Sequence, residues 1–269
     1  MIHLRSISLA RSARDRNVSF PFSIPALEKL EELTFTSPVT FFVGENGSGK
    51  STLLEALARA TQSIAAGTES VDRDPTLEHV EPLARALRTV WNRRTRRGFF
   101  LRAEDFFGYV KRVNRSRTQL QQEAERVRLE NPQLPEGELE RITAPYAGSA
   151  SALEGRYGAD MDARSHGEQF LSFFQARVVP GGLYLLDEPE VPLSPARQLA
   201  LLSILKESSE RQECQFIVAS HSPILMALLD ATLLSFDEVP VREVAYEELE
   251  HVKLTRDFLN RPEAFLRHL

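Results

Sequence analysis

The sequence predicts an α/β fold in which helices cover both faces of a mainly parallel sheet. Short apolar runs, rich in β-branched and aromatic residues, have the length of buried strands and lie at 39–43, 183–186 and 216–219. Helical patterns alternate with them, over 168–178, 195–211 and 223–229. Because strands that alternate with helices form parallel sheets, one such sheet is expected. The alternating segment Leu4–Leu9 predicts a further strand.

The composition excludes several classes of protein. The 269 residues are 42% hydrophobic, carry a net charge of -5 and include one cysteine, Cys214. A single cysteine excludes an intramolecular disulfide framework and a cysteine zinc site. No apolar run has the length needed to span a bilayer, and the first residues lack the apolar core of a signal peptide. We therefore expect a cytoplasmic protein with no membrane partner.

The segment from about 108 to 162 differs from the rest of the chain. It is polar and charged over 119–128, and then passes through Pro132, Pro135 and Pro145 to a run of small residues at 148–155. This composition predicts a small helical insertion followed by a mobile loop. The insertion is too short to form a long coiled-coil arm.

A glycine-rich segment follows the apolar run 39–43 and fits the phosphate-binding pattern G-x-x-x-x-G-K-[ST]. Glycines at its turns allow successive backbone N–H groups to face a phosphate, and the helix N-terminus adds partial positive charge. We expect Lys50 to reach the β- and γ-phosphates of ATP and the Ser51 hydroxyl to bind Mg²⁺. The predicted phosphate loop is Gly44, Glu45, Asn46, Gly47, Ser48, Gly49, Lys50, Ser51 and Thr52.

Two acids end the apolar run 183–186. Ligands of open α/β sheets gather at the carboxyl ends of strands, where Asp187 and Glu188 are expected to lie. Hydrolysis of a terminal phosphate needs a metal ligand and a group that orients water, and we assign these roles to Asp187 and Glu188 in that order. The alternative is a solvent-facing acidic loop. The phosphate loop that precedes these two acids in the sequence argues against it.

Two further motifs carry a resemblance to a known family. The segment 165–169, Ser-His-Gly-Glu-Gln, lies before Asp187, and 220–223, Ser-His-Ser-Pro, follows a predicted strand after Glu188. The first resembles the ABC signature and the second the ABC switch histidine. In this order the motifs resemble those of ABC-class ATPases, and the strings 41–56 and 187–190 resemble soluble bacterial AAA-type ATPases related to structural-maintenance-of-chromosomes proteins rather than transporter subunits.

The resemblance implies a P-loop NTPase fold of the ABC ATPase head type, a single domain over 1–269. It implies a homodimer with two ATP molecules and Mg²⁺ at its interface, in which Ser165 and Gly167 of one copy contact the γ-phosphate bound by the other. It also implies that His221 contacts the γ-phosphate. Alternatives stay open: Ser165 as a helix N-cap, with Glu168 completing the cap, and His221 as a structural residue at a strand end.

Some positions depart from the ABC pattern. Arg164 and His166 replace the usual signature residues, and 191–195 is not the crossing loop of transporters. No glutamine follows the strand-like run 98–101, where the class places its metal-sensing residue, so Glu104 is only a weak candidate for that role. No aromatic residue is assigned to stacking on adenine.

Several functions remain open at this level. The leading one is an ATP-driven switch or motor for a DNA-maintenance or defence partner, which could be a protein or DNA. Others are the energy subunit of an ABC transporter, a small-molecule kinase and a nucleotide-binding regulator with low turnover. A kinase must exclude the water that Glu188 would orient, which argues against that class. The basic segment Trp91–Arg97 fits contact with a phosphate backbone, or a solvated helix end.

Overall fold

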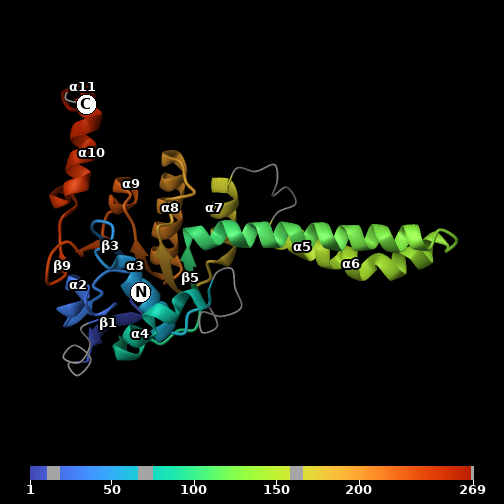
Figure 1. Ribbon diagram of the computed structural model, residues 1–269, viewed down its shortest axis with the longest axis horizontal. Helices are drawn as coiled ribbons and strands as arrows, with labels where there is room; N and C mark the ends of the chain where they lie inside the picture. Colours follow the sequence, from blue (N-terminus) through green and yellow to red (C-terminus); the bar gives the residue numbers. More distant parts are fainter. Residues whose placement is uncertain (11–18, 66–74, 158–165, 268–269) are drawn as a thin grey trace. The chain divides into compact units, whose positions relative to one another are not determined.

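The computed structural model describes residues 1–10, 19–65, 75–157 and 166–267. The chain divides into two compact units, of which the first comprises Met1–Ala103 with Val178–Leu269 and the second Glu104–Arg177. Figure 1 shows the elements of both units along the chain. Among the described residues, no helix has the length and apolar character needed to cross a membrane.

The first unit is built on a six-stranded sheet. Its strand order is β5-β6-β7-β3-β8-β9, and all pairs are parallel except β8 with β9. The three predicted strands are confirmed and are central, with every residue buried. The bounds are β3 Val39–Val43, β5 Gly98–Arg102, β6 Leu183–Asp187, β7 Gln215–Ala219, β8 Thr232–Ser235 and β9 Arg242–Glu243.

A second, three-stranded sheet is antiparallel. It has the order β2-β1-β4, with β1 at Leu4–Leu9 as predicted, β2 at Glu32–Thr34 and β4 at Leu87–Trp91. The buried side chain of Gln215, in β7, accepts from the backbone N–H groups of His3 and Leu4 at 2.8 and 2.7 Å. Trp91 ends a strand, so the helix end predicted for the basic segment is wrong; residues 92–97 connect β4 to β5.

The helices of the first unit alternate with the strands of its sheet along the chain. The apolar face predicted after Lys50 is buried in α3, which packs on β6 and β7. Helix α9 ends three residues earlier than expected, because Ala227 leaves the helical conformation. The bounds are α2 Pro25–Glu28, α3 Lys50–Ala60, η2 Pro75–Val80, α4 Glu81–Ala86, α8 Pro195–Arg211, α9 Pro223–Met226, η3 Tyr246–Glu248, α10 Glu250–Asn260 and α11 Pro262–Leu266.

The second unit is helical, and its helices are longer than the sequence suggested. It contains α5 (Ala103–Glu130, whose first residue belongs to the first unit), α6 (Glu136–Tyr157) and α7 (His166–Arg177). At 1.5 Å per residue, α5 is about 42 Å long. Figure 1 shows α5 and α6 running side by side, and residues of both helices line a hollow of about 340 Å³. The rings of Phe170 and Phe173 pack against Phe106, with centroids 5.1 and 5.3 Å away.

The mobile loop predicted at 148–155 is wrong, because these residues continue α6. Alanine and serine are compatible with a helix, and the run contains one glycine before its last position, Gly148. Pro145 lies inside the same helix, where it removes one backbone donor. Residues 158–162, which end the predicted insertion, lie outside the described residues.

Candidate functional site

The phosphate loop connects β3 to α3, as the motif requires. Gly44, Gly47 and Gly49 all have positive φ angles, of 142°, 82° and 105°. Gly49 is also tightly packed, because a Cβ there would lie 2.8 Å from Ile24 Cγ2. Glu45, Asn46 and Gly47 are exposed at the tip of the loop, whereas Ser48, Ser51 and Thr52 are partly buried.

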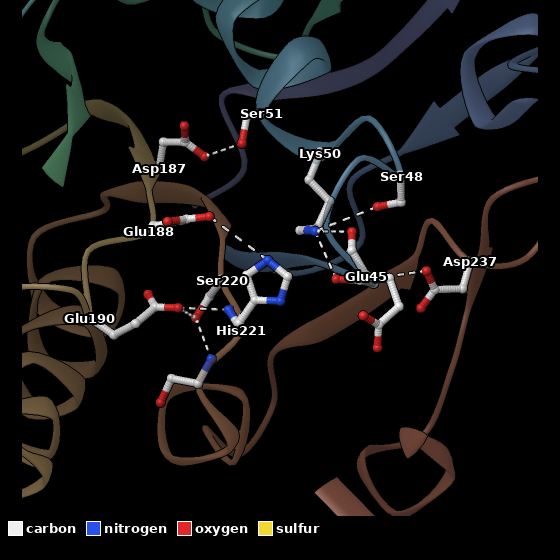
Figure 2. Close-up of polar contacts among 12 residues, drawn as sticks. Glu45, Ser48, Lys50, Ser51, Asp187, Glu188, Glu190, Ser220, His221 and Asp237 are labelled. Atoms are coloured by element: carbon white, nitrogen blue, oxygen red, sulfur yellow. Dashed lines mark hydrogen bonds and ion pairs between the residues drawn. The ribbon is translucent and has the colours of Figure 1, made fainter. Parts of the chain in front are cut away.

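Lys50 is buried and its ammonium group points back into the loop. Its Nζ donates to the carbonyl oxygens of Gly44 and Glu45 at 2.7 and 2.8 Å (Figure 2). Burial lowers the pKa of Lys50, and the carboxylates of Asp237, Glu188, Asp187 and Glu45 oppose that shift. Backbone carbonyls thus hold the cation at a place where the surrounding amides are suited to phosphate oxygens.

Asp187, the last residue of β6, contacts Ser51 in the first turn of α3. The Ser51 hydroxyl donates to Asp187 Oδ1 at 2.9 Å. Burial raises the pKa of Asp187 to about 7, and the bond from Ser51 opposes the shift. One carboxylate and one hydroxyl fit Mg²⁺, which takes oxygen ligands and keeps positions for substrate phosphates and water. Asp187 and Ser51 are therefore the residues that would hold the metal ion.

Glu188 has an unusual backbone conformation. Its φ is 48°, in the left-handed region that non-glycine residues seldom adopt, and its N–H donates to Ala219 O at 2.9 Å. The turn directs the carboxylate away from its neighbour Asp187 (Figure 2). The side chain keeps 43% of its surface exposed, so water can reach it. Strained conformations of this kind concentrate at functional sites.

His221 faces Glu188 from the next strand. Its Nε2 lies 3.8 Å from Glu188 Oε1, and burial, with Lys50 nearby, lowers the pKa of His221. Glu190 positions this segment, because its Oε1 accepts from Ser220 Oγ at 2.8 Å and from the His221 N–H at 2.6 Å. Ser222 then caps α9, accepting from the N–H groups of Ile224 and Leu225.

The sequence did not point to the roles of Glu190 or Asp237. Glu190 is close in sequence to the predicted acids, but its bond to the His221 backbone depends on the pairing of β6 with β7. Asp237 lies beyond β8 and its Oδ1 accepts from the Glu45 N–H at 2.7 Å. No local motif marks Asp237, since the parallel register of β3 and β8 creates the contact.

A buried ion pair lies beside Asp187. Arg102 pairs with Asp187 in the β5–β6 register and directs its NH1 to Glu55 Oε1, 3.2 Å away. His79 Nε2 lies 3.1 Å from Glu55 Oε2, and Arg102 also donates to Thr76. Arg102 therefore occupies the expected position of a metal-sensing residue but points to α3 and η2.

The remaining predicted residues belong to the second unit or lie outside the described residues. Gly167 is buried in the first described turn of α7, His166–Arg177. Ser165 lies outside the described residues. Glu104 is in α5, and its side chain is not described. The structure thus brings together the phosphate loop, Asp187, Glu188 and His221, all in the first unit.

Comparisons with known proteins agree with this geometry. Residues 19–140, which contain the phosphate loop, match the AAA domain family. The chain is an ATPase with a P-loop NTPase fold, and residues 19–140 resemble the AAA domain family. The match supports the family resemblance of the sequence motifs, and the parallel sheet confirms the P-loop NTPase fold.

Solved structures with similarity to this ATPase include two that cover most of the chain. One is the SMC head domain from Thermotoga maritima, with 18% identity, a TM-score of 0.45, and coverage of 90% of this chain and 98% of that one. Another is cbiO1 from Clostridium perfringens, part of the ABC transporter complex cbiONQ, with 16% identity, a TM-score of 0.48 and full coverage of both chains. No curated protein matches the sequence.

Proposed function

We propose that this ATPase binds ATP with Mg²⁺ at the phosphate loop and hydrolyses it at sites that two copies of the chain complete together. The observation that carries the proposal is the meeting of three loops at adjacent strand ends. Asp187 ends β6 and Glu188 follows it, His221 follows β7 and the phosphate loop follows β3, and these strands are neighbours in the sheet. Ligands of open α/β sheets bind at this edge.

Each group then has one task in hydrolysis. The backbone N–H groups of the loop bind the phosphates, and Lys50 exchanges its two carbonyl partners for phosphate oxygens. Ser51 and Asp187 would hold Mg²⁺, which would supply positive charge to neutralise the phosphates. Glu188 orients water for attack on the γ-phosphate, and His221 donates to a γ-phosphate oxygen. Positioning and electrostatic stabilisation account for most of the catalysis in this reaction.

The use of two copies comes from the ABC-class resemblance. Ser165 and Gly167 of one copy would contact the γ-phosphate bound by the other, so that ATP closes the dimer and hydrolysis opens it. We extend the proposal to a cytoplasmic switch or motor that acts on a DNA-maintenance or defence partner. In this proposal residues 1–269 form a single ATPase domain, and the helical unit is an insertion within it.

A mixing experiment tests the shared site. Lys50→Ala removes the phosphate-binding lysine, and Gly167→Asp places a carboxylate against the partner's γ-phosphate. Each variant should be inactive alone, whereas a mixture forms a heterodimer with one intact site and should recover part of the ATPase rate. The matched control mixes Lys50→Ala with Ser51→Ala; both lack the same motif, so no intact site forms and no activity should return.

Dimer formation gives a second, independent readout. Glu188→Gln should accumulate an ATP-bound dimer, which light scattering detects as a doubled mass with ATP and Mg²⁺. A monomeric Glu188→Gln protein at saturating ATP, together with no recovery in the mixture, would show that each chain hydrolyses ATP alone. Ser165 would then be only a helix cap.

A further inference from the structure

Asp237 is held against the start of the phosphate loop by the sheet itself. Strand β8 pairs in parallel with β3, and Val43 is opposite Ser235. The next residue, Phe236, donates its N–H to Val43 O at 2.8 Å and is buried with its ring 4.9 Å from that of Phe42. The backbone bond and the ring contact together fix where Asp237 leaves the sheet.

One peptide group of the phosphate loop is bonded at both ends. The peptide that joins Gly44 to Glu45 presents its N–H to Asp237 Oδ1 at 2.7 Å and its carbonyl oxygen to Lys50 Nζ at 2.7 Å. Asp237 thus determines which way this peptide faces, and the peptide in turn holds the lysine. Figure 2 shows Asp237 and Lys50 on opposite sides of Glu45.

Gly44 lets the carboxylate come this close. A Cβ at Gly44 would lie 2.8 Å from Asp237 Oδ1 and 3.1 Å from Ser48 Oγ. The φ of Gly44 is 142°, which also disfavours any other residue. The glycine thus permits both the turn of the loop and its contact with Asp237.

The charge of Asp237 is opposite to what phosphate binding requires. A carboxylate beside an anionic ligand repels it, so direct contact with the nucleotide does not explain Asp237. A carboxylate is, however, a strong acceptor for a backbone N–H. It also favours the charged form of Lys50, whose pKa burial lowers.

We propose that Asp237 is a positioning residue of the phosphate loop, which fixes the Gly44–Glu45 peptide so that Lys50 is placed for the nucleotide phosphates. The inference rests on the proposed use of the loop as the ATP site. When ATP draws Lys50 away from Gly44 O, the bond to Asp237 keeps the peptide from turning over. The loop then needs no rearrangement to bind the phosphates.

Two substitutions of Asp237 should change the Kd for Mg·ATP in different ways. Asp237→Ala removes the acceptor, so the Kd for Mg·ATP should rise about tenfold, the range of one hydrogen bond to a charged group. The kcat at saturating ATP should change less than twofold, because the catalytic groups are elsewhere. Asp237→Asn keeps an acceptor oxygen and removes the repulsive charge, so its Kd should equal that of the wild type or fall below it.

Titration calorimetry with Mg·ATP and steady-state kinetics measure both quantities, with Glu238→Gln as the matched control. Glu238 is a neighbouring exposed acid that bonds to Arg242 and not to the loop. Tighter binding by both Asp237 variants would show that the carboxylate acts only through its charge, and an unchanged Kd in Asp237→Ala would also overturn the proposal. Lys50→Ala distinguishes failure of the Asp237 proposal from failure of the proposed ATP site. If Lys50→Ala binds ATP like the wild type, the phosphate loop is not the ATP site.

Discussion

The phosphate-binding edge of the first unit and the helical pair of the second are built by different rules. At the edge, Lys50 and Asp187 are buried and each has a hydrogen-bond partner from another element or the loop. Along α5, Arg126 makes exposed, local ion pairs with Glu123 at 2.7 Å and with Glu130 at 3.7 Å. Buried polar contacts are costly to break, whereas exposed pairs contribute little.

Substitutions should therefore have different effects in the two regions. At the sheet edge, hydrogen bonds between side chains and the loop fix their positions, so a single substitution should affect ligand binding. In the helical pair, many exposed side chains are interchangeable as long as the helix forms. The second unit also has its own aromatic contacts, so its stability need not depend on the nucleotide site.

The largest expected effect is the loss of Lys50. Lys50→Ala should weaken ATP binding roughly 100-fold or more, because a charge-assisted contact to phosphate is removed from a buried site. In the helical pair, Arg126→Ala removes an exposed cation and should leave ATP affinity within about twofold. Calorimetric titration of both proteins tests the comparison, and equal affinities would contradict it.

A smaller effect concerns pH and Asp187. Burial raises the pKa of Asp187 to about 7, so over about pH 4 to 7 the folded protein binds a proton that the unfolded chain has lost. Unfolding then releases this proton, and the contribution of Asp187 to stability falls as the pH rises through that range. Between pH 5 and 7 the change covers about two pH units, so Asp187→Asn should remove a pH-dependent change of roughly 2 to 3 kcal/mol.

Thermal unfolding of metal-free, nucleotide-free protein between pH 5 and 8 measures this difference. The wild type should lose more stability than Asp187→Asn over that interval. Parallel curves for the two proteins would show that the carboxyl is ionised in the folded state throughout.

The smallest expected effect lies in the helical pair. Pro145→Ala restores one backbone donor within α6 and should stabilise residues 136–157 by about 1 kcal/mol, since proline disfavours a helix interior. Hydrogen exchange of these amides should slow, while the ATPase rate stays unchanged. A changed rate would mean that the helical pair controls the nucleotide site and is not energetically separate from it.

The two regions also differ in how far the sequence predicts them. The strands β3, β6 and β7 are short, fully buried apolar runs next to motifs of fixed spacing, so their positions and those of Lys50, Asp187 and Glu188 follow from local residues. The helix α6 was predicted in part as a loop, because Pro145 and small residues resemble a linker when their neighbours are unknown. The strands β2 and β4 are half exposed, so their sequences carry only a weak apolar pattern.

Contacts between residues far apart in the sequence are the ones that sequence patterns do not predict. Asp237 is 192 positions from Glu45, and only the β3–β8 pairing brings them within 2.7 Å. Arg102 ends β5, and the direction of its side chain depends on Glu55 in α3 and on Thr76. Sequence patterns identify which residue types carry the chemistry, whereas the sheet register decides which side chains hold them in place.

Glu188, which follows β6, is proposed to orient the attacking water. The most direct measurement compares Glu188→Gln with the wild type for both ATP affinity and phosphate release. We expect the ATP affinity of Glu188→Gln to stay within about threefold of the wild type and its phosphate release to be slower by roughly 100-fold or more, the range for loss of a general acid–base group. Phosphate release close to the wild-type rate would contradict this proposal and assign the water-orienting role to another residue.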